Sequence, residues 1–157
     1  MGTGYNGNYQ KDFYRFDPQA AAGQQWEIVN GFGGQKRQGG TSFVIDDKAY
    51  ICCGVNNGSY VYDFWCFYPS TGVFTQLRDI ADTSDDDYDE DYTSIVRANA
   101  VSFVIDGKGY LVTGEYGSLL SNYWIYDPAT DLWEGEDLTA FEGSVRINAV
   151  AFYTGTR

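Results

Sequence analysis

The segments SFVIDDKAYICCG at residues 42–54 and SFVIDGKGYLVTG at residues 102–114 are nearly identical, and this internal repeat decides the fold. Each copy contains an apolar run rich in β-branched and aromatic residues, a two-residue turn, and a second apolar run that ends at a glycine. Asp106 and Gly107 form the residue pair that a tight hairpin turn prefers, because both positions need a positive φ angle. Each copy therefore predicts two antiparallel strands joined by a short turn.

A second repeated segment lies downstream of each hairpin. DFWCFYPSTGVF at residues 63–74 matches NYWIYDPATDLW at residues 122–133, and a shorter version, DFYRFDP, stands at residues 12–18. These segments predict an aromatic strand, a proline-containing turn and a short final strand. VRINAVAFYTGTR at residues 145–157 is a last partial copy, which matches the sequence at residues 96–108. The repeating unit is thus four strands, and we expect an all-β chain.

The repeat period is close to 50 residues. Phe103 precedes Phe152 by 49 positions, whereas Phe43 precedes Phe103 by 60, so one unit carries an insertion of about ten residues. The insertion is the acidic stretch DTSDDDYDEDYTS at residues 82–94, which holds seven of the 22 acidic side chains. Charge runs of this kind are usually solvated, so we expect an exposed, mobile loop here.

A period near 50, with glycine after the second strand, tyrosine and Asp-Pro around the third and tryptophan in the fourth, resembles the Kelch repeat of β-propellers. The resemblance is carried by GYLVTG at residues 109–114 and YWIYDPATDLW at residues 123–133. The chain is also similar to the bacterial Kelch propellers grouped with galactose oxidase. It departs from the family where paired glycines follow the second strand. The pairs in this chain are Thr3-Gly4, Cys53-Gly54 and Thr113-Gly114.

The resemblance implies three blade equivalents in this chain. Residues 1–30 supply the last three strands of one blade, residues 37–78 and 97–138 supply two full blades around the acidic insertion at 79–96, and residues 145–157 supply a lone first strand. Propellers close with about four to eight blades, so three do not make a ring. We expect self-association by strand exchange into a six-bladed homodimer, or a longer parent chain that contains the other half.

Composition excludes several functions. The 157 residues include 22 acidic and 10 basic side chains, for a net charge of −12, and no histidine. The missing histidine rules out Ser-His-Asp and Cys-His catalytic centres and imidazole metal ligands. It also means that the copper site of galactose oxidase cannot be carried over, so no cofactor is expected. Without a basic stripe to neutralise phosphates, no nucleic-acid partner is expected either.

The remaining sequence signals are weaker. The sequence contains no apolar run of about 18 residues, the length that would predict a membrane span. The N-terminal segment MGTGYNGNYQ is polar and lacks the apolar stretch of a signal peptide. The family resemblance nevertheless implies a bacterial periplasmic or cell-surface location. Cys52, Cys53 and Cys66 have no metal-type spacing and are expected to be buried thiols, with a bridge from Cys66 to either neighbour as the alternative.

Propeller geometry places the connections that follow the second and fourth strands of each blade on one face, where long and varied loops usually carry function. We call this the loop face. The candidate ligand-binding residues there are Arg37, Arg97, Arg146, Tyr60, Glu115 and Tyr116. The arginines either form a ring that recognises carboxylate or sulfate groups, or brace neighbouring blades, which their recurrence favours. The tyrosines are candidates for stacking on sugar rings.

The acidic insertion offers weak calcium candidates, because hard cations prefer several carboxylate oxygens. These candidates are Asp85, Asp87, Asp89 and Asp91. Their spacing is not that of an EF-hand, so a solvated loop is the preferred interpretation, with Tyr88 and Tyr92 as candidate partner contacts.

The predicted function is a non-catalytic interaction scaffold that binds a protein segment or a glycan on the loop face. The alternative is a carbohydrate-active enzyme of the Kelch-type sialic-acid mutarotase class, because an arginine ring would suit an acidic sugar. No acid–base pair can be named for that chemistry, and a fold by itself does not confer an activity.

Overall fold

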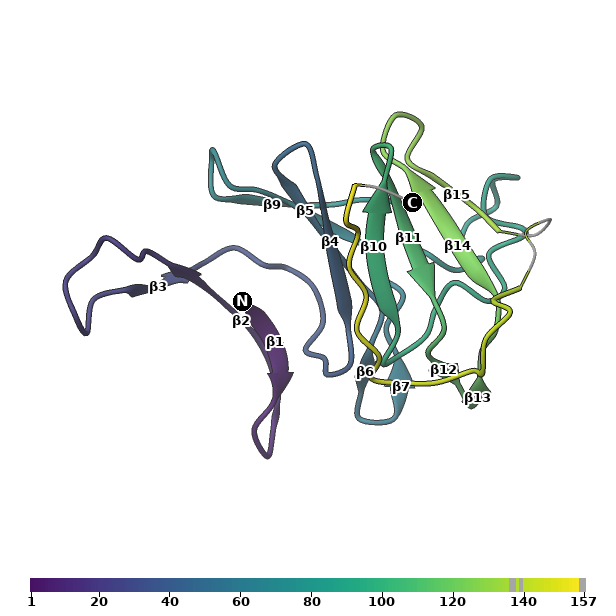
Figure 1. Cartoon of the computed structure of the whole chain (residues 1–157), viewed down its shortest axis with the longest axis horizontal. Coiled ribbons are helices and arrows are strands. Elements are labelled where there is room, and N and C mark those ends of the chain that lie inside the picture. Colours follow the sequence, from purple (N-terminus) through teal and green to yellow (C-terminus); the bar gives the residue numbers. More distant parts are fainter. Residues whose placement is uncertain (136–137, 139, 156–157) are drawn as a thin grey trace.

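The computed structural model describes residues 1–135, 138 and 140–155. Within these residues the secondary structure consists of strands and turns without a helix, which confirms the all-β class (Figure 1). It follows that the described part contains no helix long and apolar enough to cross a membrane.

Three antiparallel sheets follow one another along the chain. The N-terminal sheet has the order β1 (Gly2–Tyr5), β2 (Tyr9–Phe16), β3 (Trp26–Val29). The central sheet has the order β4 (Thr41–Ile45), β5 (Lys48–Cys52), β8 (Trp65–Tyr68), β9 (Val73–Gln76). The C-terminal sheet has the order β10 (Val101–Ile105), β11 (Lys108–Val112), β14 (Tyr123–Asp127), β15 (Leu132–Glu134).

Two small hairpins extend from the larger sheets at the lower end of the molecule in Figure 1. One joins β6 (Val55–Asn56) to β7 (Ser59–Tyr60), and the other joins β12 (Glu115–Tyr116) to β13 (Ser118–Leu119). The turns between β4 and β5 and between β10 and β11 lie at the opposite end. Asp106 and Gly107 both have positive φ, 51° and 75°, which confirms the predicted hairpin turn.

The core lies mainly between the central and C-terminal sheets. Phe43 and Tyr50 of the central sheet stack on each other, with ring centroids 5.4 Å apart, and are covered by Tyr126 and Trp133 of the C-terminal sheet. Burying large aromatic side chains between sheets is the main stabilising contribution available to an all-β chain. The N-terminal and central sheets meet over a smaller cluster of aromatic residues: Phe13, Phe32, Trp65, Phe67 and Phe74.

The positions where the Kelch family has paired glycines keep a left-handed backbone in this chain. Cys53 has φ 65° and Gly54 has φ 98°. The same pair of positive angles occurs at the other two copies, Thr3-Gly4 and Thr113-Gly114. A Cβ on Gly54 would lie 2.6 Å from the Gln38 carbonyl oxygen, which is inside van der Waals contact. A close approach of backbone therefore requires glycine at Gly54, and likewise at Gly114, where an added Cβ would lie 2.8 Å from the Ala98 carbonyl oxygen. The first position of each pair tolerates a side chain.

The strand predicted over residues 145–157 is not formed in the described part of that segment. Residues 145–155 run beside β10 (Figure 1), where Gly114 N–H donates to the Arg146 carbonyl (3.1 Å) and Asn148 N–H donates to the Asn99 carbonyl (3.0 Å). A strand needs a hydrogen-bonded ladder, and the structure shows no strand paired with this segment. Residues 156 and 157, the end of the predicted strand, lie outside the described residues.

Replacing Gly54 with alanine is expected to lower the free energy of unfolding by about 2–4 kcal/mol, because the left-handed backbone penalty adds to the collision with the Gln38 carbonyl. Gly58 provides the matched control, since its φ is +82° and no atom lies within 4 Å of an added Cβ. Gly58→Ala should lose only the backbone penalty of about 1–2 kcal/mol. Urea unfolding measures both losses, and equal losses would contradict the close approach at Gly54.

Candidate functional site

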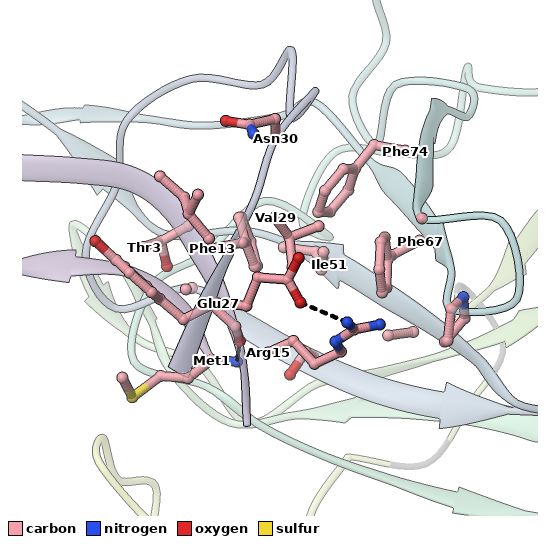
Figure 2. Close-up of a pocket in the computed structure, with 18 of the residues that line it drawn as sticks. Met1, Thr3, Phe13, Arg15, Glu27, Val29, Asn30, Ile51, Phe67 and Phe74 are labelled. Carbon is pink, nitrogen blue, oxygen red and sulfur yellow. Dashed lines mark hydrogen bonds and ion pairs between the residues drawn. The ribbon is translucent and has the colours of Figure 1, made fainter. Parts of the chain in front are cut away.

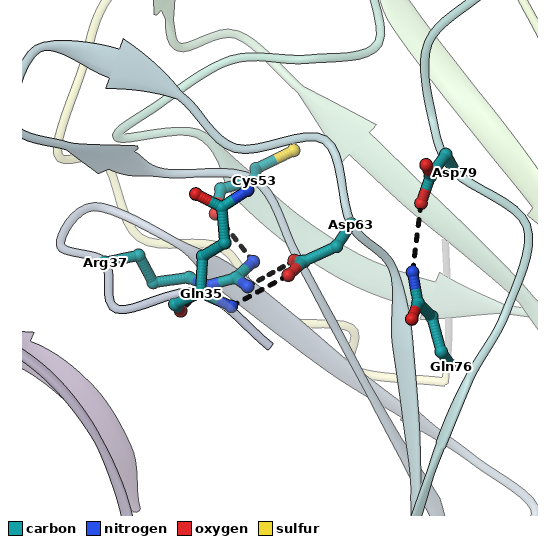
Figure 3. Close-up of polar contacts among 6 residues, drawn as sticks. All are labelled: Gln35, Arg37, Cys53, Asp63, Gln76 and Asp79. Carbon is teal, nitrogen blue, oxygen red and sulfur yellow. Dashed lines mark hydrogen bonds and ion pairs between the residues drawn. The ribbon is translucent and has the colours of Figure 1, made fainter. Parts of the chain in front are cut away.

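Arg37 is fully buried at the beginning of the central sheet (Figure 3). Its Nε donates to the Gln35 carbonyl (3.1 Å), its Nη1 to the Cys53 carbonyl (3.3 Å), and its Nη2 pairs with the Asp63 carboxylate. The other oxygen of Asp63 accepts the Gln35 N–H (2.9 Å). The guanidinium therefore joins the segment before β4, the end of β5 and the segment before β8. A buried cation held in this way is paired and hydrogen-bonded, as burial requires.

Arg97 repeats the arrangement in the C-terminal sheet. Its Nε donates to the Ile95 carbonyl (3.0 Å) and its Nη1 to the Thr113 carbonyl (2.8 Å), which are two residues before it and sixteen after it, as for Arg37. Asn122 replaces the aspartate and accepts from Nη2 through Oδ1 (3.1 Å). Burial lowers the pKa of the Arg97 guanidinium, because the charged form loses solvation.

The same arginines also join neighbouring sheets through their main chain. Gly4 N–H donates to the Arg37 carbonyl (2.8 Å), and Gly54 N–H donates to the Arg97 carbonyl (2.8 Å). The bond from Gly114 to Arg146 is the third of the series. We call each of these bonds a glycine–arginine joint. Every joint links the sheet that carries the glycine to the segment that begins the next repeat.

The arginines therefore differ in their availability to a ligand. A carboxylate or sulfate at Arg37 or Arg97 would have to displace the carbonyl partners that these fully buried side chains already have. Arg146 is exposed, and its Nε donates to the Ser144 carbonyl (2.8 Å). The structure thus does not bring the three predicted guanidinium groups together as an open ring.

The predicted tyrosines do come together on the loop face. The rings of Tyr60 and Tyr116 lie with centroids 4.4 Å apart, and Gly117 N–H donates to the Tyr60 hydroxyl (2.8 Å). Tyr116 is 53% exposed. Glu115 accepts a hydrogen bond from Asn99 Nδ2 (2.8 Å), which connects the hairpin to the segment that leads into β10. The sequence suggested these residues individually, but the small hairpins that bring them into contact were not predicted.

The acidic candidates do not gather into a cation site. The described residues contain no group of three or more acidic, cysteine or histidine side chains placed to hold a metal ion. Asp85, Asp87 and Asp91 are exposed, whereas Asp89 is fully buried and accepts from the N–H groups of Thr83 and Ser84, both at 3.1 Å. Burial acts to raise the pKa of the Asp89 carboxyl, but these hydrogen bonds outweigh it and hold the pKa below its ordinary value.

Six of the seven acidic side chains of the insertion are exposed, as expected of a solvated loop, but the insertion is also anchored to the core, which was not predicted. Tyr92 is buried, packs against Trp124 and accepts the Trp133 N–H through its hydroxyl (2.8 Å). Tyr88 lies under the Arg78 guanidinium, 4.5 Å from its centre. Neither tyrosine is therefore displayed as a free partner contact. The interleaving of these aromatic residues with the acids was the available sequence signal for an anchored loop.

A cleft that the sequence did not reveal separates the N-terminal and central sheets (Figure 2). Its volume is about 610 Å³. One wall carries Phe13 and the ion pair between Arg15 and Glu27, and the other carries Phe67 and Phe74. Thus the two sheets meet closely only over part of their facing surfaces.

The three cysteines are free and buried, which confirms the expectation of buried thiols. The Cys53 carbonyl is a partner of Arg37, so this residue contributes its backbone to the buried arginine network.

The sequence as a whole matches no protein-family model and no curated protein.

Replacing Arg97 with leucine is expected to destabilise the fold by about 3–5 kcal/mol, because several buried carbonyl oxygens lose their donors. Arg15→Leu is the control, since Arg15 forms an exposed ion pair with Glu27 and its loss should cost about 1 kcal/mol or less. Urea unfolding of both variants measures the difference. A loss at Arg97 no larger than that at Arg15 would contradict a bracing role.

Asp89→Asn is expected to destabilise the protein at neutral pH and to flatten the acid side of its stability curve. Because the folded-state pKa is lowered, the carboxylate contributes stability above its unfolded-state pKa and loses that contribution as pH falls below about 4. The gap between wild type and Asp89→Asn should therefore shrink in that range. Urea unfolding from pH 7 to pH 3 measures this, with the exposed Asp85→Asn as control, and a constant gap would refute the assignment.

Proposed function

We propose that this chain is half of a Kelch-type β-propeller that acts as a non-catalytic binding scaffold, and that its loop face recognises a protein segment or a glycan. The recurrence of one sheet plan supports the propeller, since the three sheets follow each other with the same strand pairing. The glycine–arginine joint between successive repeats supports it as well. A closed ring would require about four to eight such blades.

We further propose that six blades are completed by a second copy of the chain, or within a longer parent chain. The N-terminal sheet has three strands, whereas the central and C-terminal sheets each have four. Residues 145–155 have the sequence of a first strand but form no hydrogen-bonded ladder with any strand of the described residues. An unpaired edge favours association with a matching strand.

The two hairpins of the loop face carry the binding proposal. They follow different sheets, yet they are joined by the Tyr60–Tyr116 ring contact and by the Gly117–Tyr60 hydrogen bond. These two contacts hold the exposed Tyr116 ring in a fixed position, and Leu119 of the same hairpin is exposed as well. Rigid aromatic residues at exposed positions are favoured in binding surfaces because little conformational freedom is lost on contact.

The mutarotase alternative gains no support from the geometry. The cations proposed to bind an acidic sugar include Arg37 and Arg97, whose donors are directed to carbonyl groups of the backbone. We therefore keep the proposal to a binding function.

Tyr116→Ala is the direct test of the binding surface. A glycan array and a displayed peptide library, probed with the labelled wild-type chain, should give a ligand whose affinity falls about tenfold in this variant. Tyr62→Ala is the matched control, because Tyr62 is exposed but contributes no ring to the hairpin contact. An unchanged affinity in Tyr116→Ala, or the lack of any ligand in both libraries, would contradict the proposal.

A further inference from the structure

Two charged residues of the described chain lack the partners that their equivalents have. Asp12 stands just before the aromatic residues of β2, as Asp63 stands before those of β8, yet Asp12 has no hydrogen-bond or ion-pair partner among the described residues. Arg146 stands at the position of Arg37 and Arg97, yet among the described residues it has neither a carboxylate partner, as Arg37 has in Asp63, nor an asparagine partner, as Arg97 has in Asn122. The N-terminal sheet thus has the acid without the arginine, and the C-terminal segment has the arginine without the acid.

We propose that Arg146 of one copy pairs with Asp12 of a second copy and that this pair closes a head-to-tail joint between them. The inference rests on the proposed propeller and identifies which residues complete it. The template is the central sheet, in which Arg37 and Asp63 make the buried pair and Arg37 Nη1 donates to the Cys53 carbonyl. In this head-to-tail joint between copies, the Thr3 carbonyl takes the place of the Cys53 carbonyl.

The cleft between the N-terminal and central sheets receives the rest of the incoming segment. Phe152 is 82% exposed in the single chain and is equivalent in sequence to Phe43. Phe43 is buried against Tyr126 and Trp133, at ring distances of 6.1 and 6.2 Å. The equivalents of those two rings are Phe67 and Phe74, which line the cleft. The cleft therefore offers Phe152 of a second copy the environment that Phe43 has within one chain.

The aromatic surface of the C-terminal sheet also matches that of the N-terminal sheet of a second copy. Phe103 and Tyr110 stack at 5.3 Å, as Phe43 and Tyr50 do at 5.4 Å, but Phe103 and Tyr110 are only partly buried and line an open cavity of about 430 Å³. The rings that would cover them belong to the N-terminal sheet. They are Phe16 and Trp26, which pair across β2 and β3 as Tyr126 and Trp133 pair across β14 and β15. Their exposed fractions are 48% and 53%.

The two halves of the joint are kept apart within one chain. Main-chain bonds from Gly114 and to Asn99 hold the C-terminal segment against the C-terminal sheet, and the central sheet lies between that sheet and the N-terminal one (Figure 1). These bonds repeat those that place β10 beside β4, in which Gly54 donates to Arg97 and Asn99 donates to Gly39. The segment is thus already positioned as the first strand of a further blade, and a second copy supplies the other three.

The test is a charge exchange in the full chain, followed by sedimentation velocity. Asp12→Arg and Arg146→Asp each place like charges at both joints of a homodimer, so each variant alone should have a dissociation constant raised roughly 100-fold. An equimolar mixture contains one exchanged pair and one native pair per dimer, and should regain the mass of two chains. Asp85→Arg and Lys11→Asp, at exposed positions, are the matched controls and should associate like wild type.

Phe152→Asp is the second variant, because a side chain that is 82% exposed can be replaced without disturbing the core of its own chain. It should also be monomeric, and circular dichroism should show unchanged strand content. A wild-type dimer whose charge variants associate normally, or whose mixed variants fail to recover, overturns this joint and leaves the propeller proposal standing. A wild-type chain that stays monomeric overturns closure by a second copy itself, while the Tyr116 experiment still tests binding at the loop face.

Discussion

A buried arginine just before β4 and another just before β10 form the interactions on which the rest of the structure depends. Arg37 and Arg97 have no exposed surface, and each ties three segments of its own sheet together through carbonyl oxygens and one Asp or Asn side chain. Their main-chain carbonyls accept the glycine N–H of the preceding sheet. One residue therefore fixes both the inside of a sheet and its attachment to the next, because a buried charge is stable only when all of its partners are in place.

This constraint also determines where the molecule has room for function. Bracing contacts occupy the surroundings of Arg37 and Arg97, so the proposed ligand contacts lie instead on the β6–β7 and β12–β13 hairpins. The acidic insertion does not add a free arm, since Asp89 caps its own loop and Tyr92 enters the core. Two aromatic surfaces of the described residues are open: the cleft beside the N-terminal sheet and the cavity on the C-terminal sheet.

The strands could be predicted from the sequence because two copies of one motif, with their turn residues, repeat in register. The all-β class and the Asp106-Gly107 hairpin follow from local chemistry alone. The sequence left two roles open for the arginines, ligand binding and bracing. It could not decide between them, because the burial and direction of a guanidinium depend on segments 16 to 26 residues away. Most acidic side chains of the insertion are exposed, as its composition indicates, but its anchoring by two tyrosines and one buried aspartate was not predicted. Residues 145–155 were expected to form a strand, but a strand also requires a partner that this chain does not place beside it.

Amide hydrogen exchange across residues 145–155, measured at increasing concentrations of the wild-type chain, tests the central claim most directly. That claim is that the segment is a first strand whose blade is completed by the three strands of a second copy. Its amides, including those of Val150 and Phe152, should exchange quickly in dilute protein and become protected as copies associate, together with the amide of Gly2 on the unpaired edge of β1. Equally fast exchange at every concentration, in a chain whose central sheet is well protected, would contradict it.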